Sequence, residues 1–351
     1  MTALSEILKS RIKTQGPINV ADYMVEALMH PDHGYYTQRV VFGAQGDFIT
    51  APEISQMFGE MIALSLGQAW MAQGRPKDAI FVELGPGRGT LMLDMLRSAA
   101  AIPGFGQLPV HLVESSTKLR QIQVHALPQA EHHTDVLSLP NVPIFLVANE
   151  FLDALPIRQF WRTKHAWEEC LVGLAGDTLG FGRAAPQNFD FLKHRIKDTV
   201  QGNLIEYCPS LSHIISNISH GIKQNGGAAL LIDYGDWRSK GSTLQAVSNH
   251  KVVSPLDAPG EVDVTAHVDF EAVYKAVPPA ISSRLTPQGV FLERLGLTQR
   301  AKVLAKKLEG KALESHVAAH RRLSHPDEMG NLFKVIGIAP QADYLPAGLD
   351  I

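Results

Sequence analysis

One stretch, residues 79–95, constrains the fold of this chain more than any other. It begins with a short apolar run whose β-branched and aromatic residues are typical of a buried parallel strand. Gly85, Gly87 and Gly89 follow at alternate positions. Thr90 is then expected to cap a helix with apolar residues on one face. A strand, a glycine turn and a helix in this order predict the nucleotide-binding corner of a doubly wound α/β sheet.

The spacing of the glycines narrows the choice of ligand. The dinucleotide pattern G-x-G-x-x-G would need a glycine where Thr90 stands, and the lysine of a phosphate loop is absent. The pattern present, E-x-G-x-G-x-G, begins at Glu83 and resembles the first motif of S-adenosylmethionine (SAM)-dependent methyltransferases. Glycines let the backbone approach a ligand closely, and a helix N-terminus attracts a carboxylate. We therefore assign Glu83 and the three glycines to a cofactor site, with an ordinary glycine-rich turn as the alternative.

The composition excludes several classes of protein. Of the 351 residues, 45% are hydrophobic and 19% charged, which is typical of a soluble globular chain, and the formal net charge of −3 gives no field for nucleic acid. Cys170 and Cys208 are too few for a disulfide framework or a cysteine-based zinc site. We see no signal peptide, transit peptide or membrane span, so we expect a cytoplasmic protein.

Acids at the ends of two further predicted strands suit the same ligand. The second strand, predicted at 110–114, ends in Glu114, where an acid can bind ribose hydroxyls. Asp135 lies near the end of the next predicted strand, where adenine would lie. We therefore assign Glu114 and Asp135 to the cofactor site.

Polar residues that follow the fourth predicted strand are candidates for the chemistry, because ligands bind beyond the carboxyl ends of parallel strands. Glu150 and Asp153 are candidate catalytic carboxylates, although either could cap the following turn. Asn149 is assigned to the cofactor and could equally bond the strand end. Asp233, after the fifth strand, could contact substrate or bond turn amides. His267 is a candidate base or substrate contact, with a capping or packed histidine as the alternative.

Mostly helical sequence precedes the glycine corner. We expect residues 1–75 to form a helical lid or shoulder and 76–351 to form the sheet domain. Within that domain, alternating residues predict a β-meander inserted at about 157–205, after the fourth strand. Towards the end of the chain we predict a strand at 289–295 and a last strand at 333–338.

A series of different short motifs, which follow one another from residue 30 to residue 334, covers nearly the whole chain. They comprise residues 30–36, 46–53, 58–60, 83–90, 149–156, 233–235, 263–270 and 329–334. Each is weak alone, but the series resembles the MidA family, the SAM-dependent methyltransferases that include the mitochondrial complex I assembly arginine methyltransferase and its bacterial relatives. The resemblance implies a Rossmann-like class I methyltransferase sheet with an N-terminal helical extension and a β-rich insertion.

The resemblance also implies SAM as the cofactor and, for the mitochondrial member, N-methylation of an arginine on a respiratory complex I subunit. What bacterial members methylate does not follow from it. Thr50 falls in one of the motifs and is assigned to the cofactor site. Tyr35, Tyr36 and Phe48 belong either to the core or to the substrate entry. We expect the partner to be a protein substrate, with a complex I subunit as one candidate. We expect the chain itself to lie in a bacterial cytoplasm.

Two other functions stay open. The chain could be a non-catalytic assembly factor that keeps a SAM-binding fold and grips a partner protein. A dehydrogenase is disfavoured by the missing dinucleotide glycine. His316 and His320 have metal-like i, i+4 spacing on a predicted helix, with His325 nearby, but no acid is placed to complete a site, so we expect no metal ion.

Overall fold

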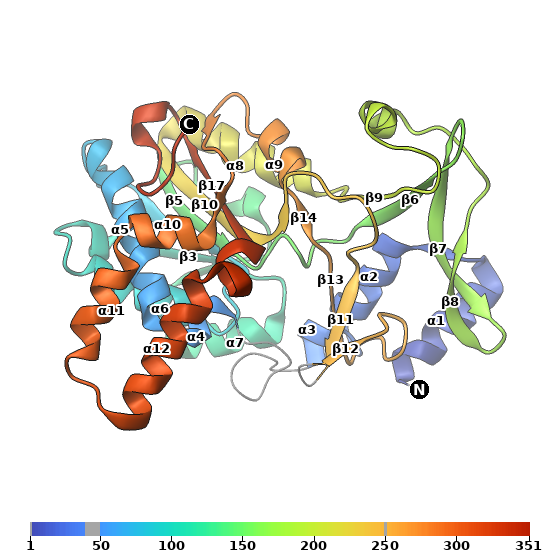
Figure 1. The fold of residues 1–351 in the computed structure, drawn as a ribbon, viewed down its shortest axis with the longest axis horizontal. Coiled ribbons are helices and arrows are strands. Elements are labelled where there is room, and N and C mark those ends of the chain that lie inside the picture. The colour runs from blue at the N-terminus through green and yellow to red at the C-terminus, as the bar shows by residue number, and fades with distance from the viewer. Residues whose placement is uncertain (1, 39–49, 249–250) are drawn as a thin grey trace.

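The computed structural model describes residues 2–38, 50–248 and 251–351, and a mixed β-sheet forms its centre (Figure 1). From edge to edge the sheet contains β15 (Ile281–Ser282), β17 (Phe333–Ala339), β10 (Gly227–Asp236), β5 (Ile144–Asn149), β2 (Ile80–Leu84), β3 (Val110–Val113) and β4 (Glu131–His133). Two short strands pair with it, β14 (Val268–Asp269) on β10 and β16 (Thr286–Pro287) on β17. The strands from β10 to β4 are parallel, whereas β17 is antiparallel to β10.

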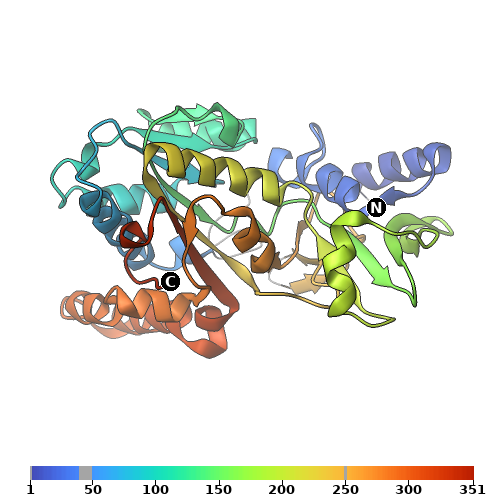
Figure 2. The ribbon, with the colours of Figure 1, turned by 90° about the horizontal axis from the view of Figure 1, so that it is seen from above.

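Both faces of this sheet are buried, as the continuous apolar run of β2 predicts. Ile80, Val82 and Leu84 face one core, and Phe81 faces the other. The first core is covered by α8 (Leu211–Asn225) and α9 (Phe270–Ala276). The second is covered by α5 (Gln56–Ala72), α6 (Thr90–Ala99), α10 (Gln288–Arg294), α11 (Leu297–Ala305) and α12 (Gly310–Ser324). Helices therefore lie on both sides of the sheet (Figure 2), and the predicted Rossmann-like fold is confirmed.

The β-insertion and the first two helices form a separate core. The insertion is an antiparallel sheet of β9 (Leu204–Tyr207), β6 (Arg158–Arg162), β7 (Trp167–Ala175) and β8 (Thr178–Arg183), joined by β1 (Ile18–Asn19). A small sheet of β12 (Lys251–Val253), β11 (Gln245–Ser248) and β13 (Asp263–Thr265) lies beside it. Leu8 of α1 (Ala3–Gln15) and Val20 of α2 (Val20–Met29) are buried with Val172 and Val264 of these sheets. Figure 1 shows this group at the end of the molecule opposite α11 and α12.

A division of the chain at residue 75 stays a prediction, and the cores themselves group the elements differently. α1 and α2 share their core with the insertion, whereas α5, from the same N-terminal segment, packs on the central sheet. The insertion also contains β9, which the alternating pattern did not predict.

Two local predictions were wrong. Residues 289–295 were predicted as a strand, but α10 forms there and buries Phe291 and Leu292 completely. A short apolar run fits either element, and burial of the pair against α11 and α12 decides for the helix. Thr90 is the first residue of α6 rather than its cap, because Gly89 occupies the N-cap position with a left-handed backbone.

Short helices complete the described chain. They are α3 (Tyr35–Gln38), α4 (Ala51–Ile54), α7 (Thr117–Ala126), η1 (Phe105–Gln107), η2 (Val136–Ser138), η3 (Asp190–Lys197), η4 (Pro326–Gly330) and η5 (Ala342–Tyr344). Within the described ranges, no helix combines the length and apolarity that crossing a membrane would require.

Candidate active site

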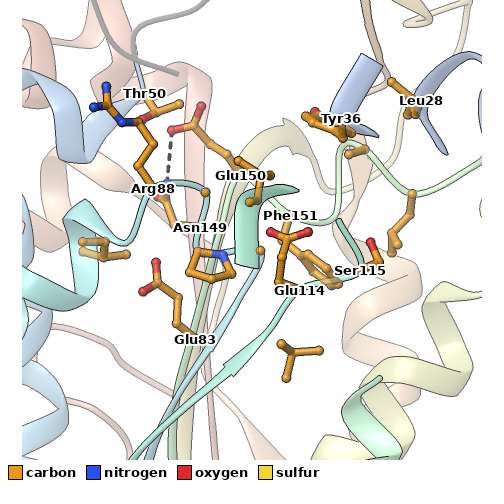
Figure 3. A pocket seen from close by; sticks show the side chains of 18 of the residues that line it. Leu28, Tyr36, Thr50, Glu83, Arg88, Glu114, Ser115, Asn149, Glu150 and Phe151 are labelled. Atoms are coloured by element: carbon orange, nitrogen blue, oxygen red, sulfur yellow. Dashed lines mark hydrogen bonds between the residues drawn. The ribbon is translucent and has the colours of Figure 1, made fainter. Parts of the chain in front are cut away.

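A cavity of about 240 Å³ opens at the carboxyl ends of β2, β3 and β5. Its walls come from the glycine turn after β2, the residues after β3 and β5, and the N-terminal helices α2 and α4. Figure 3 shows Glu83, Glu114 and Glu150 around the same space. The three predicted acids therefore meet although they come from different strands.

The glycine turn has a backbone that other residues rarely adopt. Gly85, Gly87 and Gly89 have φ angles of 62°, 53° and 84°, all in the left-handed region. At Gly85 a Cβ atom would also lie 2.9 Å from Cδ2 of Phe151. The backbone N–H of Gly89 donates to the carbonyl of Pro86 at 2.7 Å and closes the turn. The turn thus brings the backbone of Gly85 and Gly87 to the cavity wall with no side chain of their own.

Glu83 and Asn149 each have a buried oxygen with unused bonding capacity. Glu83 is 3% exposed, and its Oε2 atom finds no hydrogen-bond partner among the described residues. Burial raises the pKa of its carboxyl to about 8, against a hydrogen bond from the Met92 amide that lowers it. Oδ1 of Asn149 is likewise without a partner in the described chain. Both residues line the cavity, so a ligand with a cationic or N–H group would satisfy them.

Glu114 is held in place by a residue that the sequence did not single out. Its carboxylate accepts hydrogen bonds from the backbone of Ser116 at 2.8 Å and from the Gln123 amide at 3.4 Å. The same Gln123 nitrogen donates to the carbonyl of Gly87 at 2.8 Å. Gln123 is fully buried on α7 and joins the acid after β3 to the glycine turn. Only the folded chain reveals this role, because one glutamine on a helix carries no pattern.

The two remaining cofactor candidates differ in position. Thr50 lines the cavity at the start of α4, and this helix is tied to α6 by a 2.7 Å hydrogen bond from the Thr90 hydroxyl to Glu53. Asp135 is exposed and does not line this cavity; its carboxylate accepts from the amide of Leu137 at 2.8 Å and caps η2. Contact between Asp135 and a bound adenine stays a prediction.

Glu150 is the predicted catalytic carboxylate that reaches the cavity. Its backbone is left-handed, with a φ of 51°, which is unusual for a residue other than glycine. Its Oε1 atom accepts hydrogen bonds from the Ala51 amide and the Asn149 side chain, both at 3.1 Å. Burial, followed by the nearby charge of Asp153, raises the pKa of Glu150 to about 7. The carboxyl group is therefore poised to gain or lose a proton near neutral pH.

Asp153 lies behind the cavity rather than in its lining. The Tyr234 hydroxyl donates to its Oδ2 at 2.6 Å, while its buried Oδ1 has no partner in the described chain. Burial raises the pKa of Asp153 to about 6. Glu150 lines the cavity and Asp153 does not, so the two carboxylates are not equivalent.

Asp233 shapes the turn that carries Glu150. One of its oxygens accepts from the backbone amides of Phe151, Leu152 and Asp153, at 3.2, 2.9 and 3.2 Å. Its side chain is completely buried in the C-terminal half of β10. Of the two roles considered from the sequence, bonding turn amides is the one this geometry supports.

His267 lies apart from Glu150. It lines a second cavity of about 390 Å³ between the insertion and α9, and its ring packs edge-on against Tyr234 with 5.3 Å between centroids. Burial lowers the pKa of its imidazole. His267 is not among the residues that line the first cavity. Its catalytic role stays a prediction.

The remaining candidates have structural contacts. The Tyr36 hydroxyl donates to the Asp263 carboxylate at 2.9 Å while Tyr36 lines the cavity, and Phe48 falls outside the described residues. His316 and His320 bond the Ala301 carbonyl and the Thr298 hydroxyl, at 3.0 and 2.9 Å. These two histidines join α12 to α11.

Comparison with known proteins identifies the family. Residues 61–285 match a family model described as "Putative S-adenosyl-L-methionine-dependent methyltransferase". "Protein arginine methyltransferase NDUFAF7, mitochondrial" from Xenopus laevis is 35% identical over 97% of this chain and 85% of the relative. The human protein of that name is also 35% identical, over 97% of this chain and 84% of its own length.

Solved structures agree with the fold and the cofactor. A crystal structure from Burkholderia thailandensis, bound to S-adenosyl-homocysteine, has a TM-score of 0.83 at 27% identity and covers 99% of this chain and 93% of its own. A native structure from the same organism has a TM-score of 0.79 at 26% identity, covering 99% and 92%. The unpartnered oxygens of Glu83 and Asn149, the left-handed glycine turn and Glu114 suit the amino-acid and ribose groups of SAM. The matched family, the relatives and the shape of this cavity together establish that the chain belongs to the MidA family and is a SAM-dependent methyltransferase.

Proposed function

We propose that this methyltransferase transfers the methyl group of SAM to an arginine side chain of a protein. The observation that carries the proposal is Glu150, a carboxylate in the wall of the cavity beside the glycine turn. The names of the relatives, protein arginine methyltransferases, support the same acceptor. The aliphatic part of the acceptor side chain would lie along the apolar wall formed by Leu28 of α2 and Leu155.

An arginine acceptor presents a chemical problem that a carboxylate can solve. The guanidinium pKa exceeds about 12, and its lone pairs are delocalised. A carboxylate that pairs with two N–H groups draws positive charge away from the nitrogen that attacks the methyl carbon. It can also accept the proton that the nitrogen loses as the C–N bond forms and the C–S bond breaks. With a pKa of about 7, Glu150 can take this proton and release it again near neutral pH.

The cofactor would be held by the groups around the glycine turn. The SAM ammonium would donate to Glu83 and Asn149, whose buried oxygens have no partner in the described chain. Its carboxylate would meet the backbone N–H groups of the turn and the start of α6. Glu114 would accept from the ribose hydroxyls, and Asp135 would lie towards adenine. Thr50, on α4, would close the cavity over the methionine part.

The proposed partner is a subunit of respiratory complex I, and the proposed compartment is the bacterial cytoplasm. The partner is suggested by the name NDUFAF7 of the relatives and by the complex I role that the family resemblance implies. To test the acceptor, extract from a strain lacking this chain would be incubated with the enzyme and isotopically labelled SAM. We expect one labelled arginine peptide, which Glu150→Gln labels about 100-fold more slowly than the wild type. Label on lysine, on carboxylates or on small molecules alone would contradict the proposal.

A second candidate is an assembly factor whose methyl transfer is dispensable. An exposed aromatic side chain on the insertion supports a gripping surface, because Phe181 of β8 is 49% exposed. Complementation separates the two functions. If Glu150→Gln restores complex I assembly in the deletion strain, binding of the partner protein is sufficient for assembly. If only the wild type restores it, methyl transfer is required.

Replacing Glu114 by alanine should weaken SAM binding by about 1–3 kcal/mol, the usual loss for a hydrogen bond to a charged group. The fold should survive, because the hydrogen bonds that the acid accepts come from the neighbouring backbone at Ser115 and Ser116 and from Gln123. Calorimetric titration with SAM measures the change. Glu168→Ala on the insertion, whose carboxylate bonds Arg183, serves as the control and should bind SAM normally. Equal affinities of the two variants would remove Glu114 from the site.

The pKa of Glu150 predicts a pH dependence of the rate. Because burial raises this pKa to about 7, the carboxylate needed as a base is lost as the pH falls through that value. We expect single-turnover methyl transfer to rise from about pH 6 to about pH 8 and then to level off. Glu150→Gln should abolish this dependence on its residual rate. An unchanged profile in the variant would assign the titration to another group.

The same shift predicts a gain of stability on neutralising Glu150. A carboxyl whose pKa is raised on folding, here from 4.5 to about 7, binds its proton more tightly when folded, so its ionisation destabilises the fold as the pH rises through this window. Glu150→Gln should therefore have a higher Tm than wild type at about pH 8 and nearly the same Tm at about pH 4. A lower Tm for the variant at the higher pH would contradict the assigned shift.

A further inference from the structure

Two buried histidines and an acid meet on the edge of the central sheet, away from the cavity. His111 on β3 is the register partner of Glu131 on β4, and His133 lies two residues further along β4, on the same face. Nδ1 of His111 is 2.9 Å from Nε2 of His133. The Glu131 carboxylate lies 3.8 Å from the former atom and 4.0 Å from the latter. All three donor atoms are within 4.8 Å of one another.

The hydrogen bonds around this cluster fix one tautomer. The Ser138 hydroxyl donates to the carbonyl of Asp135 at 2.7 Å, so it is an acceptor towards Nδ1 of His133 at 3.1 Å. His133 therefore carries its proton on Nδ1, and its Nε2 atom presents a lone pair to His111. Metal-bound imidazoles likewise donate their other ring N–H to an acceptor behind them, most often a carboxylate, a carbonyl or a water, and here the Ser138 hydroxyl takes that place.

We propose that His111, Glu131 and His133 form a binding site for Zn²⁺. Two imidazole nitrogens and one carboxylate are a common zinc ligand set that leaves the fourth position to water. The inference is independent of the methyl acceptor, because none of the three residues lines the SAM cavity. The sequence did not predict the site, since His111 and Glu131 are brought together only by the pairing of β3 with β4.

Binding requires a small and local rearrangement. Two ligand atoms at about 2.0 Å from a tetrahedral ion are about 3.3 Å apart, so the histidine nitrogens must separate slightly and tilt. In the metal-free protein they share a hydrogen bond, and the His111 proton moves from Nδ1 to Nε2 when the ion replaces that bond. Glu131 is free to approach, because its side chain is 68% exposed.

The ion would add a link to an edge strand of the central sheet. β4 has three residues, and in the described part of the chain its strand partner is β3. Through Ser138 and the Asp135 carbonyl, the same contacts reach η2, the segment that we assign to the adenine end of SAM. Zinc should therefore stabilise the folded chain, since it binds a site that the unfolded chain lacks.

The experiment is a calorimetric titration of chelator-treated full-length protein with Zn²⁺, repeated on variants. We expect one site in the wild type, an affinity lower by about 100-fold or more in His133→Ala, and about 10-fold lower in Glu131→Gln. Zinc should raise the Tm of the wild type and raise that of Glu131→Gln less. Glu131→Gln keeps the test decisive even if His133→Ala fails to fold, because Glu131 is exposed.

His320→Ala on α12 is the control, because the chain has 15 histidines that could bind zinc weakly. This variant should bind zinc like the wild type. The proposal is overturned if the wild type binds no zinc at micromolar concentration. It is equally overturned if Glu131→Gln and His133→Ala bind as tightly as the wild type.

Discussion

Glu150→Gln is expected to lower the rate of methyl transfer about 100-fold or more while leaving SAM affinity nearly unchanged. Glutamine keeps the shape of the side chain and can still accept from Ala51 and Asn149. It cannot hold the negative charge that orients a guanidinium or take its proton. Single-turnover rates with saturating SAM, together with calorimetric SAM affinities, separate these two effects.

Glu168→Gln is the matched control for this variant. Its carboxylate also bonds a neighbour, Arg183, but lies on the insertion. This control should react at the wild-type rate. If Glu150→Gln also methylates the acceptor normally, Glu150 serves only to cap α4 through Ala51, and the chemistry lies elsewhere.

Gly85→Val should abolish SAM binding with the fold retained. Its backbone is left-handed with a φ of 62°, and even a Cβ atom would lie 2.9 Å from Cδ2 of Phe151. Valine would therefore push the turn or Phe151 into the space that the cofactor needs. We expect no heat of SAM binding at concentrations about 100 times the wild-type Kd, with circular dichroism still native.

Gly176→Val separates ligand contact from backbone strain. Gly176 has the same φ of 62°, but a Cβ atom there would meet nothing within 4 Å. Both variants should lose some stability, because valine resists a left-handed backbone. Only Gly85→Val should lose SAM. Normal SAM affinity in Gly85→Val would place the cofactor away from the turn.

The parts of the site that could be predicted from sequence are those built by local chain geometry. A strand followed by glycines at alternate positions admits few conformations, so Gly85 to Gly89 were placed correctly at the sheet edge. Glu114 and Glu150 reach the cavity because the strands before them are parallel and end at one edge. For these residues, the position in the sequence relative to the strand end determines the position in the fold.

The parts that could not be predicted depend on pairings between distant segments. Gln123 reaches Gly87 because α7 packs back over the turn, which no periodicity encodes. From the sequence, His267 could be a base, a substrate contact or a packed histidine, because nothing local fixes which cavity its side chain lines; in the structure it lies against Tyr234 and lines the second cavity. The side-chain direction of Asp153 could not be predicted either, although its place after β5 was clear. Asp233 accepts from the Asp153 amide in this turn, and the Asp153 carboxylate bonds Tyr234 and does not line the cavity.

The left-handed backbone at Glu150 has a consequence for how this chain would diverge under relaxed selection. A glutamate in this conformation costs about 1–2 kcal/mol relative to glycine, and asparagine tolerates it better. Asp233, by contrast, is required by the turn itself, because its oxygen satisfies three consecutive amides. A gene copy freed from the reaction should therefore drift at position 150 towards asparagine or glycine while it keeps Asp233. Under the proposed role of Glu150, glutamate at this left-handed position would mark a lineage in which the chemistry is still under selection.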